Sequence, residues 1–313
     1  MALRIIFCGT PEFAVASLRA LAEAADISVE AVITQPDRPR GRGQELAGSP
    51  VKEFALGASL HVFQPEKIKS ESAQAFIEKI APDAIAIVSY GQIIPARLLG
   101  IPRLGWINVH ASLLPRYRGA APIQWAIVNG EKITGVTTMR IDAGLDTGPM
   151  LERTEIETGA DETGPELSKR LALAGGPLLV STLRKLERGE IEPLAQDNSL
   201  ATLARPLTKE DGLIEWKMNA LAIYNRVRGL EPWPGAYTTF REQNCQVWGR
   251  PAADGEARPS PGTITESAAG ILVWCGDGTA FRLDAVRIEG RKRIAARDFA
   301  NGARLKAGEK FGD

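Results

Sequence analysis

The first half of the chain alternates short apolar runs with stretches of helical period. The apolar runs are LRIIFCG, VEAVIT, DAIAIVSYG and GWINVH, and helical patterns such as FAVASLRALAEAA and SAQAFIEKIA separate them. Runs that are apolar throughout are typical of strands buried on both faces, as in a parallel sheet. Parallel neighbours need a crossover connection, which the helical stretches provide. The pattern therefore predicts an α/β fold with a Rossmann-like, doubly wound and mostly parallel sheet.

The character of the sequence changes after residue 189. A chain of 313 residues is long for one core and sufficient for two domains. Residues 190–207 lose all periodicity, which indicates a linker, and beyond them short β-rich pieces alternate with Gly and Pro. We therefore expect a first domain over 1–189, a linker over 190–207, and a small barrel of the oligonucleotide-binding type over 208–313.

Composition excludes several classes of protein. Lys plus Arg and Asp plus Glu both number 38, so a globally basic nucleic-acid binder is excluded, although a local basic patch is not. Cys8, Cys245 and Cys275 are odd in number and widely spaced, which argues against disulfides and a zinc site and fits a reducing compartment. No apolar run approaches the ~20 residues of a membrane span. We expect no metal and no membrane partner.

A polar pair ends one of the apolar runs. In GWINVH, Asn108 and His110 lie two residues apart, so they share one face of the predicted strand, while Ile107 and Val109 point to the other. Open α/β sheets bind ligands beyond the carboxyl ends of their strands. An Asn amide can stabilise an oxygen that gains negative charge, and a His can transfer protons near neutral pH.

A carboxylate that could support His110 follows the next strand. Asp146 lies in DAGLDTGPM between Gly144 and Gly148, in a loop whose backbone can approach a ligand closely. Asn, His and Asp without a Ser or Cys nucleophile suggest direct acyl transfer to a substrate amine. These features alone leave open that His110 is structural and that Asp146 only forms a turn.

Longer motifs resemble the folate-dependent formyltransferases. The resemblance is carried by INVHASLLPRYRGAAPIQWAIVNGE and GLDTG, together with FCGTPEFA, QPDRPRGRG, SPVKEFA, YGQIIP and EPWPGAY. These motifs extend from Leu3 to Tyr237, and their joint occurrence is specific although no single one is. They are similar to the branch of the family whose acceptor is methionyl-tRNA.

The resemblance implies an activity and its residues. The activity is transfer of a formyl group from 10-formyltetrahydrofolate, the donor substrate, to the α-amine of initiator methionyl-tRNA for translation initiation. The implied catalytic residues are Asn108, His110 and Asp146. The implied folate contacts are Ser112, Leu113, Leu114 and Pro115, with Tyr90 and Gly91 forming a wall of the pterin site. The first domain would be catalytic and the second would bind tRNA, in a monomer of the cytoplasm or of an organelle with bacterial-type translation.

Basic segments are the candidates for tRNA contact. TQPDRPRGRGQEL carries Arg38, Arg40 and Arg42 among Pro and Gly, which predicts a loop without regular structure. Arg can pair with phosphate or stack on a base, and by resemblance Arg42 points to the acceptor end. A second basic cluster lies near the end of the chain, at Arg287, Arg291, Lys292, Arg293, Arg297, Arg304 and Lys306. A merely solvated surface remains the alternative for both.

Other functions fit the sequence less well. A related formyltransferase acting on an amino sugar nucleotide or a ribotide would keep the Asn, His and Asp set but would not need the Arg-rich loop. A non-catalytic RNA-binding module would not need that set. A nicotinamide dehydrogenase is least favoured, because FCGTPEF has one Gly where the dinucleotide fingerprint has three. One departure from the family is Pro206, where a Lys often stands.

Overall fold

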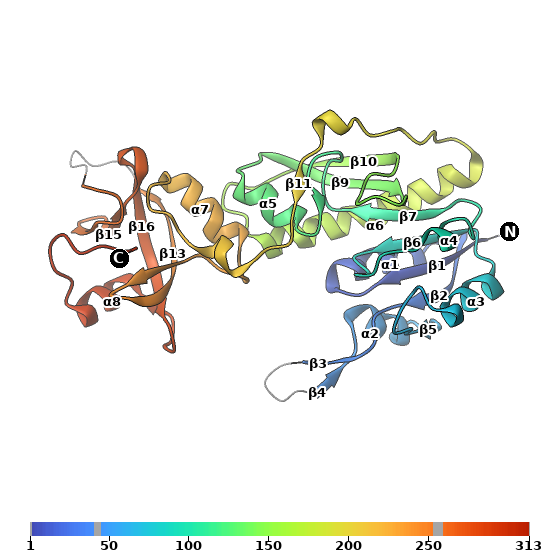
Figure 1. Cartoon of the computed structure of the whole chain (residues 1–313), viewed down its shortest axis with the longest axis horizontal. Coiled ribbons are helices and arrows are strands. Elements are labelled where there is room, and N and C mark those ends of the chain that lie inside the picture. The colour runs from blue at the N-terminus through green and yellow to red at the C-terminus, as the bar shows by residue number, and fades with distance from the viewer. Residues whose placement is uncertain (1, 41–44, 253–258, 313) are drawn as a thin grey trace. The chain divides into compact units, whose positions relative to one another are not determined.

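A computed structural model describes residues 2–40, 45–252 and 259–312 (Figure 1). These residues pack into two compact units, each built from several segments of the chain. The first unit contains Met1–Pro122, Ile133–Glu157 and Ser168–Arg205, and the second contains Ile123–Lys132, Thr158–Leu167 and Pro206–Asp313. Most of the segment expected to be a linker, up to Arg205, therefore packs with the first unit. The assignment of separate roles to the two parts stays a prediction.

A sheet of seven strands organises the first unit, in the order β10-β9-β7-β6-β1-β2-β5. The five strands from β7 to β5 run parallel, whereas β9 is antiparallel to β7 and β10 is antiparallel to β9. The mostly parallel sheet expected from the sequence is confirmed, with two reversed strands at one side. The strands are β1 (Leu3–Gly9), β2 (Ile27–Ile33), β5 (Val62–Phe63), β6 (Ala84–Val88), β7 (Trp106–His110), β9 (Ile133–Arg140) and β10 (Met150–Glu157).

Helices separate the parallel strands, and local capping starts two of them. The Ser49 side chain accepts a hydrogen bond from the Lys52 N–H, and Ser70 accepts one from Ala73, so each serine satisfies a donor of the first helical turn. The helices of this part of the chain are α1 (Glu12–Ala22), α2 (Pro50–Gly57), α3 (Glu71–Ile80), α4 (Ala96–Leu99), α5 (Pro122–Val128) and α6 (Gly164–Arg188). Among the described residues, no helix is both long and apolar enough to cross a membrane.

Strand β7 is packed on both faces, as its apolar run predicts. Trp106 belongs to the core cluster that contains Ile77 of α3 and Leu98 of α4. Val109 faces the opposite way, where a Cβ added to Gly175 of α6 would lie 2.9 Å from a Val109 methyl carbon. By the alternation of a strand, Asn108 and His110 therefore lie on the Trp106 face.

The second unit is an antiparallel β structure, as the β-rich sequence predicts. Its sheet has the order β12-β13-β16-β15-β14, with β17 paired to β16. Its elements are α7 (Ala220–Gly229), β12 (Tyr237–Phe240), β13 (Gln243–Ala252), β14 (Ile264–Ser267), β15 (Gly270–Trp274), β16 (Ala280–Ile288), β17 (Ile294–Ala295) and α8 (Ala296–Ala303). Its core is rich in aromatic side chains, which are Trp216, Phe240, Phe281, Phe299 and Phe311.

Two adjacent glycines let α6 pack closely on its neighbours within the first unit. A Cβ added to Gly176 would lie 2.9 Å from the Ala16 carbonyl oxygen of α1, and backbone cannot move aside as a side chain can. We predict that Gly176→Ala lowers the free energy of unfolding by about 1–3 kcal/mol through overpacking, although Ala gains about 1 kcal/mol over Gly in helix propensity.

Thermal and denaturant unfolding measure this effect, and Gly302→Ala is the matched control. Gly302 lies in α8 and has open space around the position of its missing Cβ. It should therefore show only the propensity gain. Equal stabilisation by the two substitutions would contradict the close contact.

Candidate active site

His110, the last residue of β7, is held at both ring nitrogens. Its ring Nδ1 lies 3.6 Å from Asp146 Oδ2, and its Nε2 lies 2.9 Å from the Tyr117 carbonyl oxygen. Because a carbonyl can only accept, Nε2 donates to it, and a proton on Nδ1 as well would suit the facing carboxylate. The side chain is only 6% exposed. The structure thus brings two of the three expected catalytic residues together.

The Asp146 carboxylate has a second partner in the backbone. Its Oδ2 accepts a hydrogen bond of 2.8 Å from the Gly119 N–H. Asp146 itself has a φ of +51°, a conformation that L residues adopt at some cost. Gly148 lies close to another part of the backbone, since an added Cβ would lie 1.9 Å from the Arg140 carbonyl oxygen. The approach of this loop to a ligand stays a prediction.

The route by which Asp146 reaches His110 is indirect. Asp146 follows the next strand of the sheet after β7, as the sequence indicated, but that strand, β9, runs antiparallel to β7. Its last residue, Arg140, pairs with Ile107, and the Ile141 N–H donates to the Trp106 carbonyl. The Asp146 loop therefore starts beside the first half of β7 and must fold back toward His110. The sequence did not reveal this path because strand direction is set by long-range pairing.

Asn108 is partly exposed, and its amide makes no hydrogen bond within the part of the chain described. It pairs with Met139 in the β7–β9 ladder, on the same strand face as His110. An amide donor that is free beside a histidine is available to a substrate oxygen.

Hydrogen bonds hold the turn that is expected to contact folate. Ser112 is buried, and its Oγ donates to the Arg116 carbonyl at 2.6 Å. Thr137 donates to the Ser112 carbonyl at 2.7 Å and accepts from the Leu114 N–H at 3.2 Å. Leu114 is buried and Leu113 and Pro115 are half-buried. Sequence reasoning missed Thr137, which lies opposite His110 in the ladder, because a buried Thr in a strand gives no distinct signal.

Tyr90 and Gly91 follow β6. The Tyr90 side chain is 2% exposed, and burial followed by the nearby Cys8 thiol raises the pKa of its phenol. The Tyr90 carbonyl accepts from Thr10 Oγ1 at 3.2 Å and from Gln35 Nε2 at 3.1 Å. Gly91 is exposed with a φ of +86°. Any contact with a ligand at Tyr90 would thus come from its backbone, and the pterin wall stays a prediction.

The segment expected to be a linker contributes to the site. Strand β11 (Leu203–Ala204) pairs in parallel with β8 (Arg118–Gly119), directly after the turn that holds His110. Thr202 Oγ1 accepts from the Tyr117 N–H at 2.8 Å. A two-residue strand and single side-chain contacts have no periodicity, so the sequence pattern could not reveal them.

The Arg-rich stretch is not irregular throughout, contrary to expectation. Strand β3 (Arg38–Arg40) pairs antiparallel with β4 (Glu45–Ala47). A two-stranded ribbon has two free edges, so Pro39, which lacks an N–H, is tolerated there. Lys52 binds Asp37 at the base of the ribbon and, with Gln64, holds the pKa of that carboxyl below its usual value. Arg38 is exposed, whereas Arg42 lies outside the described residues.

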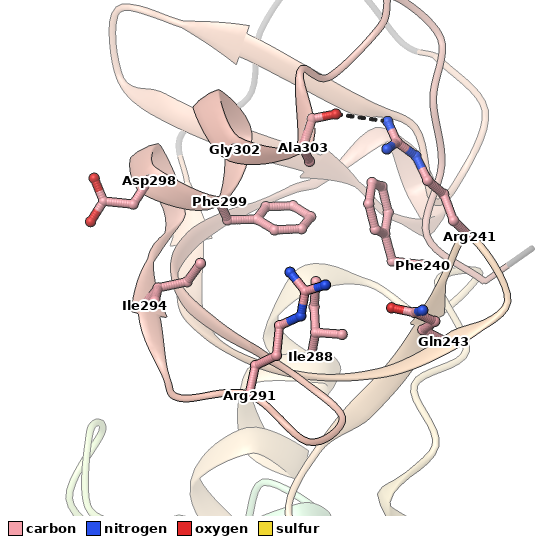
Figure 2. A pocket seen from close by; sticks show the side chains of 10 residues that line it. All are labelled: Phe240, Arg241, Gln243, Ile288, Arg291, Ile294, Asp298, Phe299, Gly302 and Ala303. Atoms are coloured by element: carbon pink, nitrogen blue, oxygen red, sulfur yellow. Dashed lines mark hydrogen bonds between the residues drawn. The ribbon is translucent and has the colours of Figure 1, made fainter.

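Arg291, one member of the basic cluster expected near the end of the chain, lines a pocket of about 390 Å³ in the second unit (Figure 2). Phe240, Phe299, Ile288 and Ile294 line it, and the Arg291 side chain projects among them. Arg241 donates to the Ala303 carbonyl at the rim. All members of the basic cluster are exposed, namely Arg287, Arg291, Lys292, Arg293, Arg297, Arg304 and Lys306.

The parts of the chain that the structure describes contain neither a metal site nor a reactive thiol. No group of three or more His, Cys, Asp or Glu residues could hold a metal ion there. Cys8, Cys245 and Cys275 are free and buried. Burial raises the pKa of the Cys245 thiol to about 11 and that of Cys275 to about 12, so both are poor nucleophiles.

Known proteins resemble this chain along its whole length. The methionyl-tRNA formyltransferase of Solibacter usitatus (strain Ellin6076) is 55% identical over 312 residues, which are 99% of each chain. That of Koribacter versatilis (strain Ellin345) is 50% identical over 309 residues, or 98% of each. The structure of an N-formyltransferase from Helicobacter canadensis, in complex with folinic acid and dTDP-3-aminofucose, matches with a TM-score of 0.66 at 17% identity and covers 94% of this chain and 100% of its own.

The last match shows the fold alone. The family models are more specific, because "Formyl transferase" matches residues 3–183 and "Formyl transferase, C-terminal domain" matches residues 206–304. The first range contains Asn108, His110 and Asp146, and the second contains the antiparallel sheet of the second unit. The chain belongs to the formyl transferase family.

Proposed function

We propose that this protein transfers a formyl group from 10-formyltetrahydrofolate to the α-amine of methionyl-tRNA. The observation that carries the proposal is the His110 ring held between Asp146 and the Tyr117 carbonyl, beside the free amide of Asn108. Relatives that are 55% and 50% identical over nearly the full chain support the choice of acceptor, since both are named methionyl-tRNA formyltransferase.

The reaction joins the acceptor nitrogen to the formyl carbon and breaks the bond from that carbon to folate nitrogen. Attack by the amine puts negative charge on the formyl oxygen, where the Asn108 amide would donate. A protonated His110 would donate there from Nε2, which would exchange the Tyr117 carbonyl for substrate. The acceptor amine loses one proton and the departing folate nitrogen gains one, so the same nitrogen can serve both transfers. Asp146 would favour the charged form of His110 and orient its ring.

Two basic surfaces would bind the tRNA. In the first unit these are Arg38, Arg40 and Arg42, and in the second the cluster around Arg291. Arg38 and Arg291 are exposed, and neither makes an ion pair with the described residues. We further propose that initiator tRNA is the acceptor, in the cytoplasm, which the three free thiols fit. A monomeric state stays a prediction.

One alternative acceptor is a sugar nucleotide, as in the Helicobacter canadensis protein whose fold this chain shares. That likeness, at 17% identity, does not extend to substrate. A non-catalytic RNA-binding role would leave the His110 and Asp146 pair without use. Amino sugar nucleotides and ribotides therefore serve as control acceptors in the first assay below.

We predict that His110→Ala lowers formyl transfer to charged initiator tRNA by about 10²–10⁴-fold, because it removes the proton carrier and an oxyanion donor. Radioactive formyl incorporation from 10-formyltetrahydrofolate measures this directly. His61→Gln is the matched control, since the second histidine stacks on Phe76 away from the site residues and should keep native turnover. Near-native transfer by His110→Ala would refute the mechanism, and transfer only to a sugar nucleotide would refute the acceptor.

We predict that Arg42→Ala and Arg38→Ala weaken use of methionyl-tRNA and leave folate binding intact, because arginines that neutralise phosphates do not touch the donor. Each lost phosphate contact should reduce the salt slope of tRNA binding by roughly one unit. Filter binding at several salt concentrations measures that slope. The control is Arg188→Ala, which removes an exposed arginine paired with Glu190 at the end of α6. An unchanged slope in both the Arg42→Ala and the Arg38→Ala variant would indicate a merely solvated surface.

We predict that a chelator leaves turnover unchanged, because protonated side chains and amides supply the charge stabilisation that a metal would otherwise give. The measurement is formyl transfer after dialysis against EDTA, with and without added divalent ions. The acceptor tRNA should be refolded beforehand, so that its own Mg²⁺ requirement is not read as one of the enzyme. Loss of turnover that a divalent ion restores would contradict the prediction.

A further inference from the structure

One side chain of the segment first taken for a linker joins both loops of the site. Gln196 Nε2 donates to the carbonyl of Asp146 at 2.8 Å and to that of Gly148 at 2.7 Å. Gln196 Oε1 accepts from Arg118, at 3.0 Å from Nε and 2.8 Å from Nη2. This amide therefore makes all of its hydrogen bonds to the Asp146 loop and to the strand that follows the His110 turn. We call residues 196–204 the strap.

The rest of the strap holds one of these two segments, the turn and strand that follow His110. Asn198 Oδ1 accepts from Arg118 Nη2 at 2.9 Å, and the Thr202 carbonyl accepts from the Arg118 N–H at 2.9 Å. Thr202 Oγ1 accepts from the Tyr117 N–H. Tyr117, with a φ of +60°, is the residue whose carbonyl accepts from His110.

Glycine 119 shows how tightly the strap fits. Its φ is +118°, and an added Cβ would lie 2.6 Å from the Ala204 carbonyl oxygen of the strap. The same Gly119 gives its N–H to Asp146. The strap thus fixes the backbone donor that holds the carboxylate, and Gln196 fixes the backbone of the carboxylate's own loop.

The antiparallel direction of β9 makes this support necessary. The Asp146 loop leaves the sheet beside Ile107 and not beside His110, so no strand end places the carboxylate at the ring. Asp146 also has a backbone conformation that L residues rarely adopt. A conformation of this kind persists only when surrounding contacts determine it.

We propose that Gln196 and Thr202 are positioning residues of formyl transfer, which hold Asp146 and the Tyr117 carbonyl against His110. The inference rests on the catalytic roles proposed above for His110 and Asp146. It adds that these roles depend on a segment without catalytic groups of its own. Asp146 is the ionisable group in ion-pair contact with His110, and Arg118 faces Gln196 and Asn198 instead.

Two substitutions separate positioning from folding. Gln196→Glu keeps the acceptor for Arg118 but places an oxygen opposite the Asp146 and Gly148 carbonyls, so it breaks only the tie to the catalytic loop. Thr202→Val keeps the shape but removes the acceptor for the Tyr117 N–H, and Thr202→Ser restores it. Ser199→Ala is the control within the strap, because the Ser199 hydroxyl donates to Asp197 and, among the described residues, to no residue of the site.

We expect Gln196→Glu and Thr202→Val to lower kcat by about 10- to 100-fold, the effect of a small displacement at a reacting centre, with KM for the formyl donor unchanged. The kcat–pH profile should differ from that of the native protein, because the Asp146 carboxylate would no longer lie at its place beside the ring. The His110 imidazole resonance should shift while that of His61 stays in place. Thr202→Ser and Ser199→Ala should behave as the native protein.

His110→Ala and Asp146→Asn are assayed in parallel. If they lose turnover while Gln196→Glu and Thr202→Val keep native kcat, pH profile and His110 resonance, the strap inference is overturned and the mechanism stands. If His110→Ala and Asp146→Asn themselves keep turnover, the proposed mechanism has failed instead. If kcat, donor binding and melting temperature all fall together in these variants, the strap has only a structural role, and the inference is also overturned. Should Gln196→Glu not fold, the Thr202 pair decides alone.

Discussion

The carboxylate of Asp146 faces the His110 ring across 3.6 Å, although the two residues follow strands that run in opposite directions. This pairing is the interaction on which the remaining site contacts converge. The Tyr117 carbonyl accepts from Nε2 and the carboxylate faces Nδ1, so both ring nitrogens have a partner before substrate arrives. Such preorganisation is what makes electrostatic catalysis effective.

The supports around this pair are largely backbone groups. The Tyr117 carbonyl holds one ring nitrogen and the Gly119 N–H holds the carboxylate, and both belong to one short turn. Backbone groups are precise only when the chain that carries them is immobile. Here a buried strand fixes His110 from one side. From the other side, Thr202 accepts a hydrogen bond from the turn and Gln196 donates one to the Asp146 loop.

Binding of a polyanionic acceptor is compatible with a formal net charge of zero because the charges are unevenly placed. In the first unit Arg38 stands exposed on a ribbon anchored by the Asp37–Lys52 ion pair. In the second, Arg291 lines a pocket, and the other members of the basic cluster are exposed. Contacts of this kind are screened by salt, whereas the partly buried pair at His110 is screened much less. Ionic strength should thus act on acceptor binding far more than on chemistry.

Local pattern determined much of this protein. The alternation of apolar and helical runs predicted the sheet, and the spacing of Asn108 and His110 placed them on one face, because strand and helix periods are properties of neighbouring residues. Motif resemblance pointed to the family. The direction of β9, the hairpin at Arg38 and the contacts of Gln196 were decided by tertiary structure. The direction of β9 and the contacts of Gln196 depend on pairing between segments distant in the chain, which leaves no periodic trace around either partner. The hairpin at Arg38 joins neighbouring segments, but its strands of three residues are too short to show a period.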